Sequence, residues 1–370
     1  MPAQKPFPVI IAAPKRFTVV PRAEAEMWNT DFETIQSGKY GNLRLHRLSL
    51  LLDTGSAAQE LAGVGYDGSL ILPRSARYGS HEKALDGFNW LVSTLFFGGL
   101  LFPPVSSSQL AFGRLTAEGY FRYVDPIGSR AAIQQALVEK LTNDAFLDEL
   151  HSPLVVPASS IVGAYRRGRA VTDALGDKID VGGLTIAYGA YFDGRFRDAM
   201  NYGWVLVEQL LASIWNTLFL VDVSSMKFGG RKGALKQVAG SANGTIEMLV
   251  QADLVDETTW QSLTAARKAR NRYFHEGAKP NEDACRNCLR AAVRLVDVIC
   301  THAGVPTDLK GWTERLKVKR VAREESIRPA SEVDWSQKLV YRTVPPLPGE
   351  PTWKGSFETF PDIRIEAYES

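Results

Sequence analysis

The chain has 370 residues, of which 43 are Lys or Arg and 41 are Asp or Glu, so its net charge is +2 with neutral histidines. Hydrophobic residues make up 45% and charged residues 23%, which fits a globular protein of two or three domains and excludes a disordered chain and a collagen-like or coiled-coil fibre. Three cysteines are too few for a disulfide framework, so we expect a cytoplasmic protein. The near-neutral total gives no whole-chain reason to expect a polyanionic partner.

Neither a targeting signal nor a membrane span is predicted. The first residues, MPAQKPFPVIIAAPKRF, contain four prolines and only a short apolar run, which makes a poor signal peptide. The segment FNWLVSTLFFGGLLF is 15 uncharged residues long before Pro103-Pro104, and a membrane-spanning helix needs about 20. We therefore predict a buried helix over His81–Leu101.

Residues 1–185 are expected to form a mixed α/β domain that is rich in strands. The alternation in Asn42–Leu52 predicts a strand, and a turn at Asp53-Thr54-Gly55-Ser56 separates it from a second strand that includes Leu70–Leu72. Ser107–Val124 is strand material with turn residues, and Ser129–Leu150 has helical spacing.

Residues 186–305 are expected to form a bundle of four helices. A helical seam runs through Met200–Val221, a weaker helix covers Leu235–Leu254, and Gly277 suits the C-terminal cap of a third helix, Asp256–Glu276. Asn281 suits the N-cap of a fourth helix that ends near His302. The predicted fold is thus α+β: the mixed domain, the bundle, and an extended C-terminal tail over residues 306–370, where Pro345–Pro351 holds four prolines.

The third bundle helix carries the residues that best suit catalysis. A helical wheel at about 100° per residue, counted from Trp260, places Arg270 at about 280°, Asn271 at about 20° and His275 at about 60°. The apolar Leu263 and Phe274 lie in the same arc, so these polar residues are predicted on the core-facing side, where they need partners or a groove. The surrounding Arg267–Arg294 has eight Lys or Arg and three Asp or Glu, a local net charge of +5.

Two interpretations of these residues stay open at this point. A histidine can move protons near neutral pH, an arginine can stabilise charge that builds on phosphorus, and an asparagine can orient either group, as phosphodiester cleavage requires. Alternatively, His275 simply favours the helix dipole in the last turn, and Arg270 forms an ion pair with Glu208.

The motif Arg270-Asn271-x-x-x-His275 resembles the Arg-x4–6-His motif of HEPN domains, most closely of the ApeA-like type. The long apolar helix RDAMNYGWVLVEQLL, the GGRKGALKQ turn and the closing helix agree with this resemblance, which covers residues 190–303. It resembles no family that we recognise over residues 1–185.

The resemblance implies metal-independent cleavage of RNA without a cofactor, through attack of a ribose 2′-OH that leaves a 2′,3′-cyclic phosphate. It assigns the catalytic roles to Arg270, Asn271 and His275, and a supporting role to Glu208. It also implies that RNA is contacted by Arg267, Lys268 and Arg272. It further implies that the chain forms a homodimer through the bundle. The implied cellular role is that of a toxin in prokaryotic anti-phage defence by abortive infection. A phage-derived trigger or a regulatory partner would then bind the N-terminal domain. Many HEPN domains are instead inactive scaffolds that bind RNA or dimerise.

Another motif competes with this interpretation. Asp53-Thr54-Gly55-Ser56 resembles the active-site loop of aspartic proteases, in which two aspartates share a proton. The chain has no second Asp-Thr/Ser-Gly, so a turn between strands is favoured over a protease site.

A metal site and a second basic segment were weighed as well. Cys288 and Cys300 would lie about 18 Å apart on one helix, too far to share a zinc ion with Cys285 and His302, so the cysteines are predicted to be core residues. The basic run Arg315–Arg323 predicts either a solvated linker or a contact with the RNA backbone.

Overall fold

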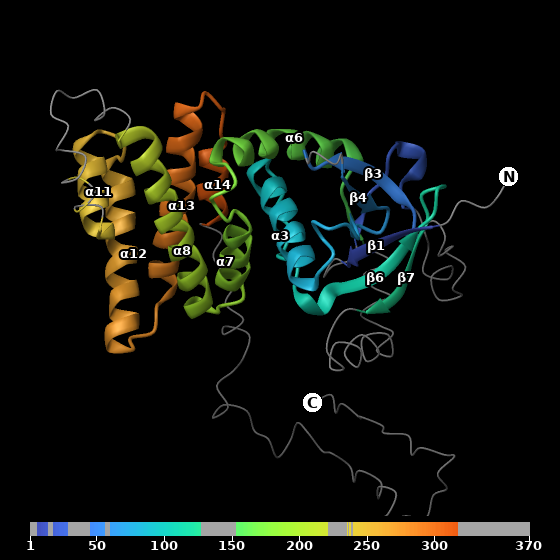
Figure 1. The fold of residues 1–370 in the computed structure, drawn as a ribbon, viewed down its shortest axis with the longest axis horizontal. Coiled ribbons are helices and arrows are strands. Elements are labelled where there is room, and N and C mark those ends of the chain that lie inside the picture. Colours follow the sequence, from blue (N-terminus) through green and yellow to red (C-terminus); the bar gives the residue numbers. More distant parts are fainter. Residues whose placement is uncertain are drawn as a thin grey trace, which may run out of the picture. The chain divides into compact units, whose positions relative to one another are not determined.

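The computed structural model describes residues 6–13, 18–28, 45–55, 60–126, 153–220, 235, 237 and 240–316, which belong to one compact unit ending at Lys317. An antiparallel β-sheet domain is followed by a region of packed helices, so the fold is α+β, as predicted (Figure 1). The predicted helix over Ser129–Leu150 lies outside the described residues. No described helix combines the length and the apolar character needed to cross a membrane.

The main sheet has six antiparallel strands. Their spatial order is β3 (Leu48–Asp53), β4 (Leu61–Gly65), β5 (Leu70–Pro73), β1 (Phe7–Ala12), β6 (Leu110–Leu115) and β7 (Phe121–Pro126). The sequence analysis did not predict β1, although it is a central strand. Both of its faces are buried, so its apolar residues form a continuous run instead of an alternating pattern.

The two edge strands of this sheet meet at one end. Arg47, just before β3, pairs with Tyr120, just before β7, and the Leu48 amide donates to the Gly119 carbonyl over 2.8 Å. The sheet therefore curls, and its inner face encloses a small apolar core made of Val9, Ile11, Leu48, Ile71 and Phe121.

A polar cluster lies beside this closure. The Asp67 carboxylate accepts hydrogen bonds from the Ser69 amide (3.0 Å) and hydroxyl (2.9 Å), and His46 Nδ1 lies 3.6 Å from it. The Ser69 hydroxyl also lies 2.8 Å from the Tyr123 hydroxyl. Burial raises the pKa of Asp67 to about 6 and lowers the pKa of His46, because both charged forms lose solvent.

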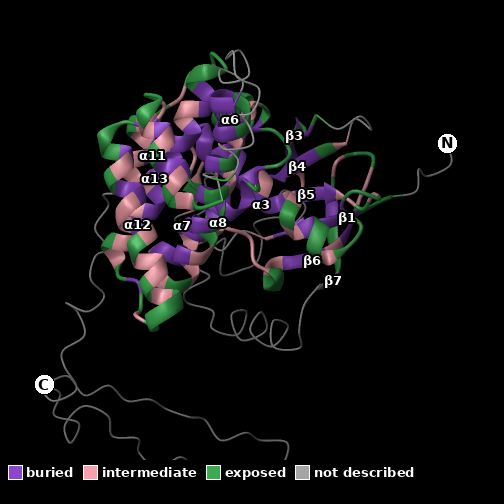
Figure 2. Cartoon of the chain, turned by 60° about the vertical axis from the view of Figure 1, so that its left-hand side comes forward, coloured by how far each residue is buried: buried purple, intermediate pink, exposed green. Residues whose placement is uncertain are grey.

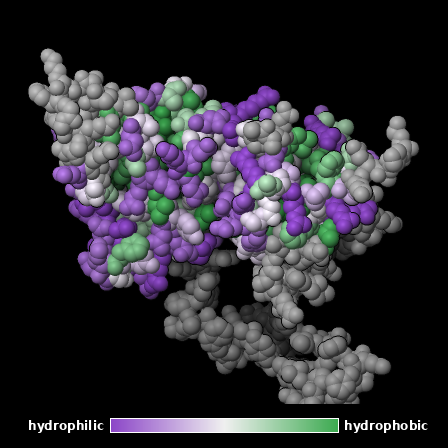
Figure 3. Space-filling model, in the orientation of Figure 1, coloured by the Kyte–Doolittle hydropathy of each residue, from purple (hydrophilic) through white to green (hydrophobic). Residues whose placement is uncertain are grey.

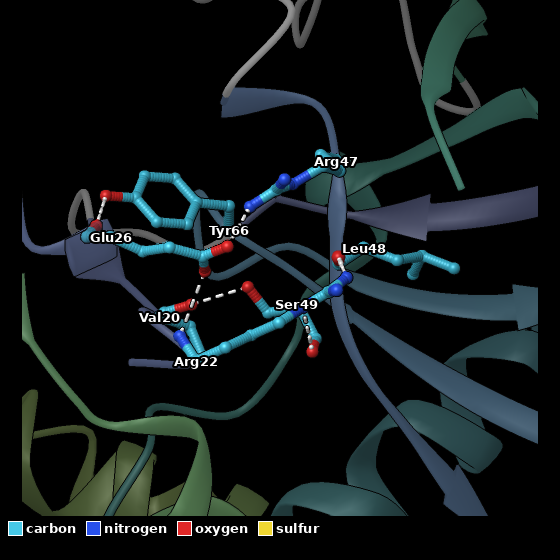
Figure 4. Close-up of polar contacts among 7 residues, drawn as sticks. All are labelled: Val20, Arg22, Glu26, Arg47, Leu48, Ser49 and Tyr66. Carbon is cyan, nitrogen blue, oxygen red and sulfur yellow. Dashed lines mark hydrogen bonds and ion pairs between the residues drawn. The ribbon is translucent and has the colours of Figure 1, made fainter. Parts of the chain in front are cut away.

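The segment before β3 is fixed by a second polar cluster (Figure 4). Glu26, in the short helix η1 (Glu24–Glu26), accepts a hydrogen bond from Arg47 over 2.6 Å and another from the Arg22 amide over 3.1 Å. The Arg22 side chain donates to the carbonyls of Leu48 and Ser49, and the Tyr66 hydroxyl donates to the Glu26 carbonyl. These contacts hold the N-terminal segment on the sheet.

Two helices cover the other face of the sheet. The predicted helix is α3 (His81–Phe97), whose N-cap Ser80 accepts a hydrogen bond from the Lys83 amide. It crosses α6 (Ala158–Leu175), which was not predicted, so closely that a Cβ on Gly168 would overlap the Thr94 carbonyl oxygen. Strand β2 (Thr18–Val19) pairs in parallel with β8 (Leu154–Val155), and the 3₁₀ helix η2 (Ser107–Gln109) precedes β6.

The helical region contains the four predicted helices and one more. These are α7 (Gly182–Phe192), α8 (Phe196–Ile214) with the π-helical turn η3 (Trp215–Phe219), α11 (Ala242–Gln251), α12 (Glu257–Glu276) and α13 (Glu282–His302). Helix α7 was missed, and the expected start of the bundle at residue 186 falls inside it. Both predicted caps are confirmed: Gly277 is left-handed with φ 70°, and Asn281 accepts from the Ala284 amide at 2.9 Å.

Helix α13 lies at the centre of this region, between α8 and α12, and ten of its residues are buried. Figure 2 shows the buried residues of α3 between the sheet and these helices. The expected extended tail is wrong for its first part, because α14 (Leu309–Arg315) is a helix with a buried Trp312. The prolines on which that expectation rested lie further along, at Pro345–Pro351, outside the described residues. The Trp312 indole donates to the Phe97 carbonyl (3.3 Å), and Arg315 donates to the carbonyls of Phe96 (3.2 Å) and Gly99 (3.1 Å).

Candidate functional site

Helix α12 is covered by its neighbours only along its first half. Its buried residues are Thr259, Ser262, Leu263 and Ala266, and none follows Ala266. The prediction that Arg270, Asn271 and His275 all lie on the core-facing side is therefore only partly right. Arg270 and Asn271 are half-buried, whereas His275 is exposed, because the last two turns of the helix extend beyond the residues that would cover them.

Arg270 has no acidic partner among the described residues. One guanidinium nitrogen donates to Asn271 Oδ1 over 3.3 Å, and the guanidinium carbon lies 4.6 Å from the centre of the Phe274 ring. Arg270 Nε is buried without any hydrogen-bond partner. The alternative ion pair with Glu208 is absent, since the Glu208 carboxylate accepts a hydrogen bond from the Trp204 indole (2.7 Å) instead.

His275 and Asn271 lie one turn apart on the same side of α12, at a spacing that brings helix side chains together. His275 occupies the last turn, and the chain leaves the helix at the left-handed Gly277. The exposed imidazole is thus open to a ligand, with Asn271 beside it and Arg270 at the border of the covered face.

The other residues predicted to contact RNA differ in their pairing. Lys268 is exposed, Arg267 is half-buried with an unpartnered Nε, and Arg272 lies 3.7 Å from the Glu276 carboxylate. Of the eight cations in Arg267–Arg294, three form ion pairs within the described part of the chain: Arg272, Arg286 and Arg294. Four of the five cations that have no ion pair there lie on the second half of α12 and the turn after it, and the fifth, Arg290, lies on α13. In Figure 3 the surface over the lower end of α12 is mostly hydrophilic, with a small apolar patch.

Two hollows are lined by residues of α8. One of about 430 Å³ lies between the start of α8 and the turn after α12, and is lined by Arg195, Arg197, Asp198 and Lys279, with Arg195 already paired to Asp193 and Asp198. Glu208 lines a different hollow, of about 390 Å³, at the start of α11. The described contacts therefore do not bring Glu208 to the motif residues.

Several large apolar side chains on the outer faces of α8 and α12 have no cover. Phe274 is 56% exposed, Val205 53% and Tyr202 47%. Phe274 was predicted on the core-facing side, yet it lies under the Arg270 guanidinium at the open end of the helix. The i,i+4 spacing of an arginine and an aromatic residue is the signal that would have indicated this pairing.

The competing Asp-Thr-Gly motif forms the end of β3 and the turn after it. Asp53 is exposed and its carboxylate accepts a hydrogen bond from the Gly55 amide (2.8 Å), with Gly55 left-handed at φ 68°. Helix α6 holds this turn, because Tyr165 donates to the Asp53 carbonyl (2.6 Å) and Arg169 to the Thr54 carbonyl (3.0 Å). These contacts are those of a turn between strands, as favoured from the sequence.

The three cysteines are buried and free, as predicted for core residues. Burial raises the pKa of Cys285 and of Cys300 to about 12, and the pKa of Cys288 is raised further, so none is a ready thiolate. Within the described ranges, no group of three or more His, Cys, Asp or Glu side chains could hold a metal ion.

Arg315 belongs to the predicted basic run, but its guanidinium binds the carbonyls at the end of α3 and so is not free for RNA. The rest of the run lies outside the described residues.

Compared with known proteins, the chain matches no family model, no curated protein and no solved structure at a significant level. A functional conclusion therefore rests on the geometry of α12 and on the motif that it carries.

Proposed function

We propose that this protein is a metal-independent endoribonuclease of the HEPN type, with its catalytic groups on α12. One observation supports this most strongly. The half-buried Arg270 has no carboxylate partner among the residues that the structure describes, and it lies beside Asn271 and one turn from an exposed His275. A cation kept partly buried without an acid is costly unless an anion compensates it, and a phosphodiester is such an anion.

The proposed reaction needs only these side chains and the RNA itself. His275 removes the proton of a ribose 2′-OH, whose oxygen attacks the adjacent phosphorus while the bond to the 5′-oxygen breaks. The products are a 2′,3′-cyclic phosphate and a 5′-OH, which receives its proton from a protonated imidazole or from water. Arg270 stabilises the extra negative charge on phosphorus in the transition state, and Asn271 orients the imidazole or a phosphate oxygen.

A second copy of the chain completes the proposed site. In a single copy the motif residues lie on an open helix end, whereas phosphoryl chemistry gains from a site that excludes water. The exposed Phe274 supplies apolar surface for a partner within the motif, and Tyr202 and Val205 supply more on α8. A homodimer through the bundle would place two Arg270–His275 motifs near one RNA strand.

The test is cleavage of labelled RNA by the full-length protein in EDTA, with a 2′-O-methyl RNA as the uncleavable control. We expect wild-type cleavage to yield cyclic-phosphate ends, and both Arg270→Ala and His275→Ala to lower the rate at least about a hundredfold. His302→Ala is a matched control, since His302 is also an exposed histidine in the last turn of a bundle helix. Arg290→Ala is the control for Arg270, because Arg290 is half-buried and unpaired within the described region.

Two other outcomes identify the alternatives. If the folded dimer binds RNA but cleaves none, with or without infected-cell extract as a source of trigger, the protein is a non-catalytic scaffold. The exposed apolar residues on α8 and α12 would serve dimerisation in that case as well. Peptide hydrolysis that is lost in Asp53→Asn would indicate the aspartic protease.

The cellular role that we propose rests on the family resemblance alone. It is a cytoplasmic anti-phage defence protein whose ribonuclease stops growth of the infected cell, under the control of a trigger at the sheet domain. Expression that is toxic in the wild type and harmless in His275→Ala would support this role, and equal growth of both would contradict it.

A further inference from the structure

Three arginines form a row across the sheet, in a part of the molecule that the proposed nuclease does not use. Pro8 on β1 pairs with Arg114 on β6, and Arg114 pairs with Arg122 on β7. On the other side of Pro8, the Arg74 amide that follows β5 donates to the Pro8 carbonyl over 3.1 Å. Arg74, Pro8, Arg114 and Arg122 are thus side by side on four adjacent strands.

The register also puts the three arginine side chains on one face. Leu72 and Phe112 lie two residues before Arg74 and Arg114, and both belong to the core that α3 and α6 cover. Because side chains alternate along a strand, the arginines continue that face one step beyond the covered core. All three arginines are exposed, so the row lies on the protein surface, next to the part of the sheet that the helices cover.

No ion pair in the described part of the chain compensates the positive charge of this row. Arg74, Arg114 and Arg122 form no ion pair and no side-chain hydrogen bond within the described part of the chain. Arg114 and Arg122 lie directly opposite each other, and like charges in that arrangement destabilise a sheet. The Glu118 carboxylate in the β6–β7 turn is held by the Thr116 side chain instead of either arginine.

The arrangement fits a chain of phosphates better than a single anion. Strands lie about 4.8 Å apart, so the row from β5 to β7 extends over about 15 Å, which is a line of charges and not a pocket. A guanidinium binds a phosphate through two parallel hydrogen bonds. The Arg74 guanidinium lies 4.6 Å above the Phe112 ring, and its outer face remains open to stack on a base.

We propose that the row Arg74–Arg114–Arg122 binds the backbone of a single-stranded nucleic acid. This site lies on the sheet domain, and its existence does not depend on whether α12 cleaves RNA. An acidic peptide is the competing ligand, and it lacks bases that could stack on Arg74.

The test measures the affinity of the full-length protein for a fluorescent 2′-O-methyl oligoribonucleotide, which cannot be cleaved, over a range of salt concentrations. Each phosphate contact to a single strand contributes about 0.7 to the slope of log affinity against log salt. We expect the triple variant Arg74→Gln, Arg114→Gln, Arg122→Gln to lower this slope by about 2 and the affinity at 0.1 M salt by about a hundredfold. Arg166→Gln should change neither, since Arg166 is an exposed, unpaired arginine on α6 of the same domain.

The single variant Arg122→Gln guards against loss of folding. It removes the repulsion with Arg114, so its melting temperature should equal or slightly exceed that of the wild type while its affinity falls about fivefold. In the Arg270→Ala background the loss caused by the row variants should persist, which separates this site from α12. The proposal is overturned if the triple variant binds the oligonucleotide like the wild type, or if its only loss is in the binding of a poly-glutamate peptide.

Discussion

Arginines at the end of α3 and arginines on α12 have opposite surroundings. Arg167 donates two hydrogen bonds to the Gly98 carbonyl, and Arg315 donates to the carbonyls of Phe96 and Gly99, so two arginines bind carbonyls at the C-terminal end of α3. Arg270 on α12 has one long hydrogen bond to its neighbour and a buried Nε without a partner. The first set fixes the junction between sheet and helices, whereas Arg270 has the position that we propose for binding a phosphodiester.

The largest effect is expected at the junction, where backbone meets backbone. In Gly168→Ala the new Cβ would overlap the Thr94 carbonyl oxygen, so α3 and α6 must move apart, and we expect a loss of about 3 kcal/mol or more in the free energy of unfolding. Gly163→Ala, on the same helix, meets only the Arg167 side chain at 3.5 Å and should be neutral or stabilising by up to about 1 kcal/mol. Urea unfolding of both variants checks this, and equal stability would refute close helix packing.

Asp67 is an intermediate case, a buried carboxylate with hydroxyl and amide donors and a histidine nearby. Its folded-state pKa of about 6 lies above the usual value of about 4, so its contribution to stability is full below pH 4 and is lost as the pH rises through 6. Asp67→Asn should remove this dependence, and the stability difference between variant and wild type should change by about 2 kcal/mol from pH 4 to pH 7. Burial lowers the pKa of His46, which has the opposite effect in both proteins, so His46→Gln in each background isolates the Asp67 contribution.

The same substitution at two arginines tests the opening contrast directly. Arg315→Met should lower the free energy of unfolding by about 2 kcal/mol, because it removes the side-chain donor of the Gly99 carbonyl and leaves the Phe96 carbonyl with backbone donors alone. Lys310→Met, an exposed lysine on the same helix, is the control and should change stability by less than about 0.5 kcal/mol.

The smallest effect is expected at Arg270. Arg270→Met should change stability by less than about 0.5 kcal/mol, since the loss of the Phe274 contact is offset by removal of a buried unpartnered nitrogen. Thermal unfolding measures it, and a loss as large as that of Arg315→Met would mean that Arg270 is a structural residue.

The local signals in the sequence predicted the helices of the bundle well. Periodicity and capping residues located α8, α12 and α13, and Gly277 and Asn281 cap as expected. Strand β1 and helices α6 and α7 were missed, because a doubly buried strand has no alternation and because the glycines in α6 and α7 permit close packing, which depends on what lies opposite.

For the candidate site, the sequence identified the polar residues but could not give their exposure. A helical wheel assumes that neighbours cover the whole length of a helix, and α12 is covered only as far as Ala266. The arginine row could not be predicted at all, since Arg74, Arg114 and Arg122 become neighbours only through the order and register of four strands.

The hydrogen bond from Trp312 to Phe97 joins residues that are 215 positions apart. During synthesis on the ribosome, the sheet and α3 emerge long before α14. The Phe97 carbonyl therefore lacks its Trp312 donor, and the surface beneath Trp312 stays uncovered, until almost the whole described chain has been made. Contacts of such long range form late in folding. A polypeptide that stops short of residue 309 would therefore contain both the sheet and the bundle and still lack one of the elements that join them.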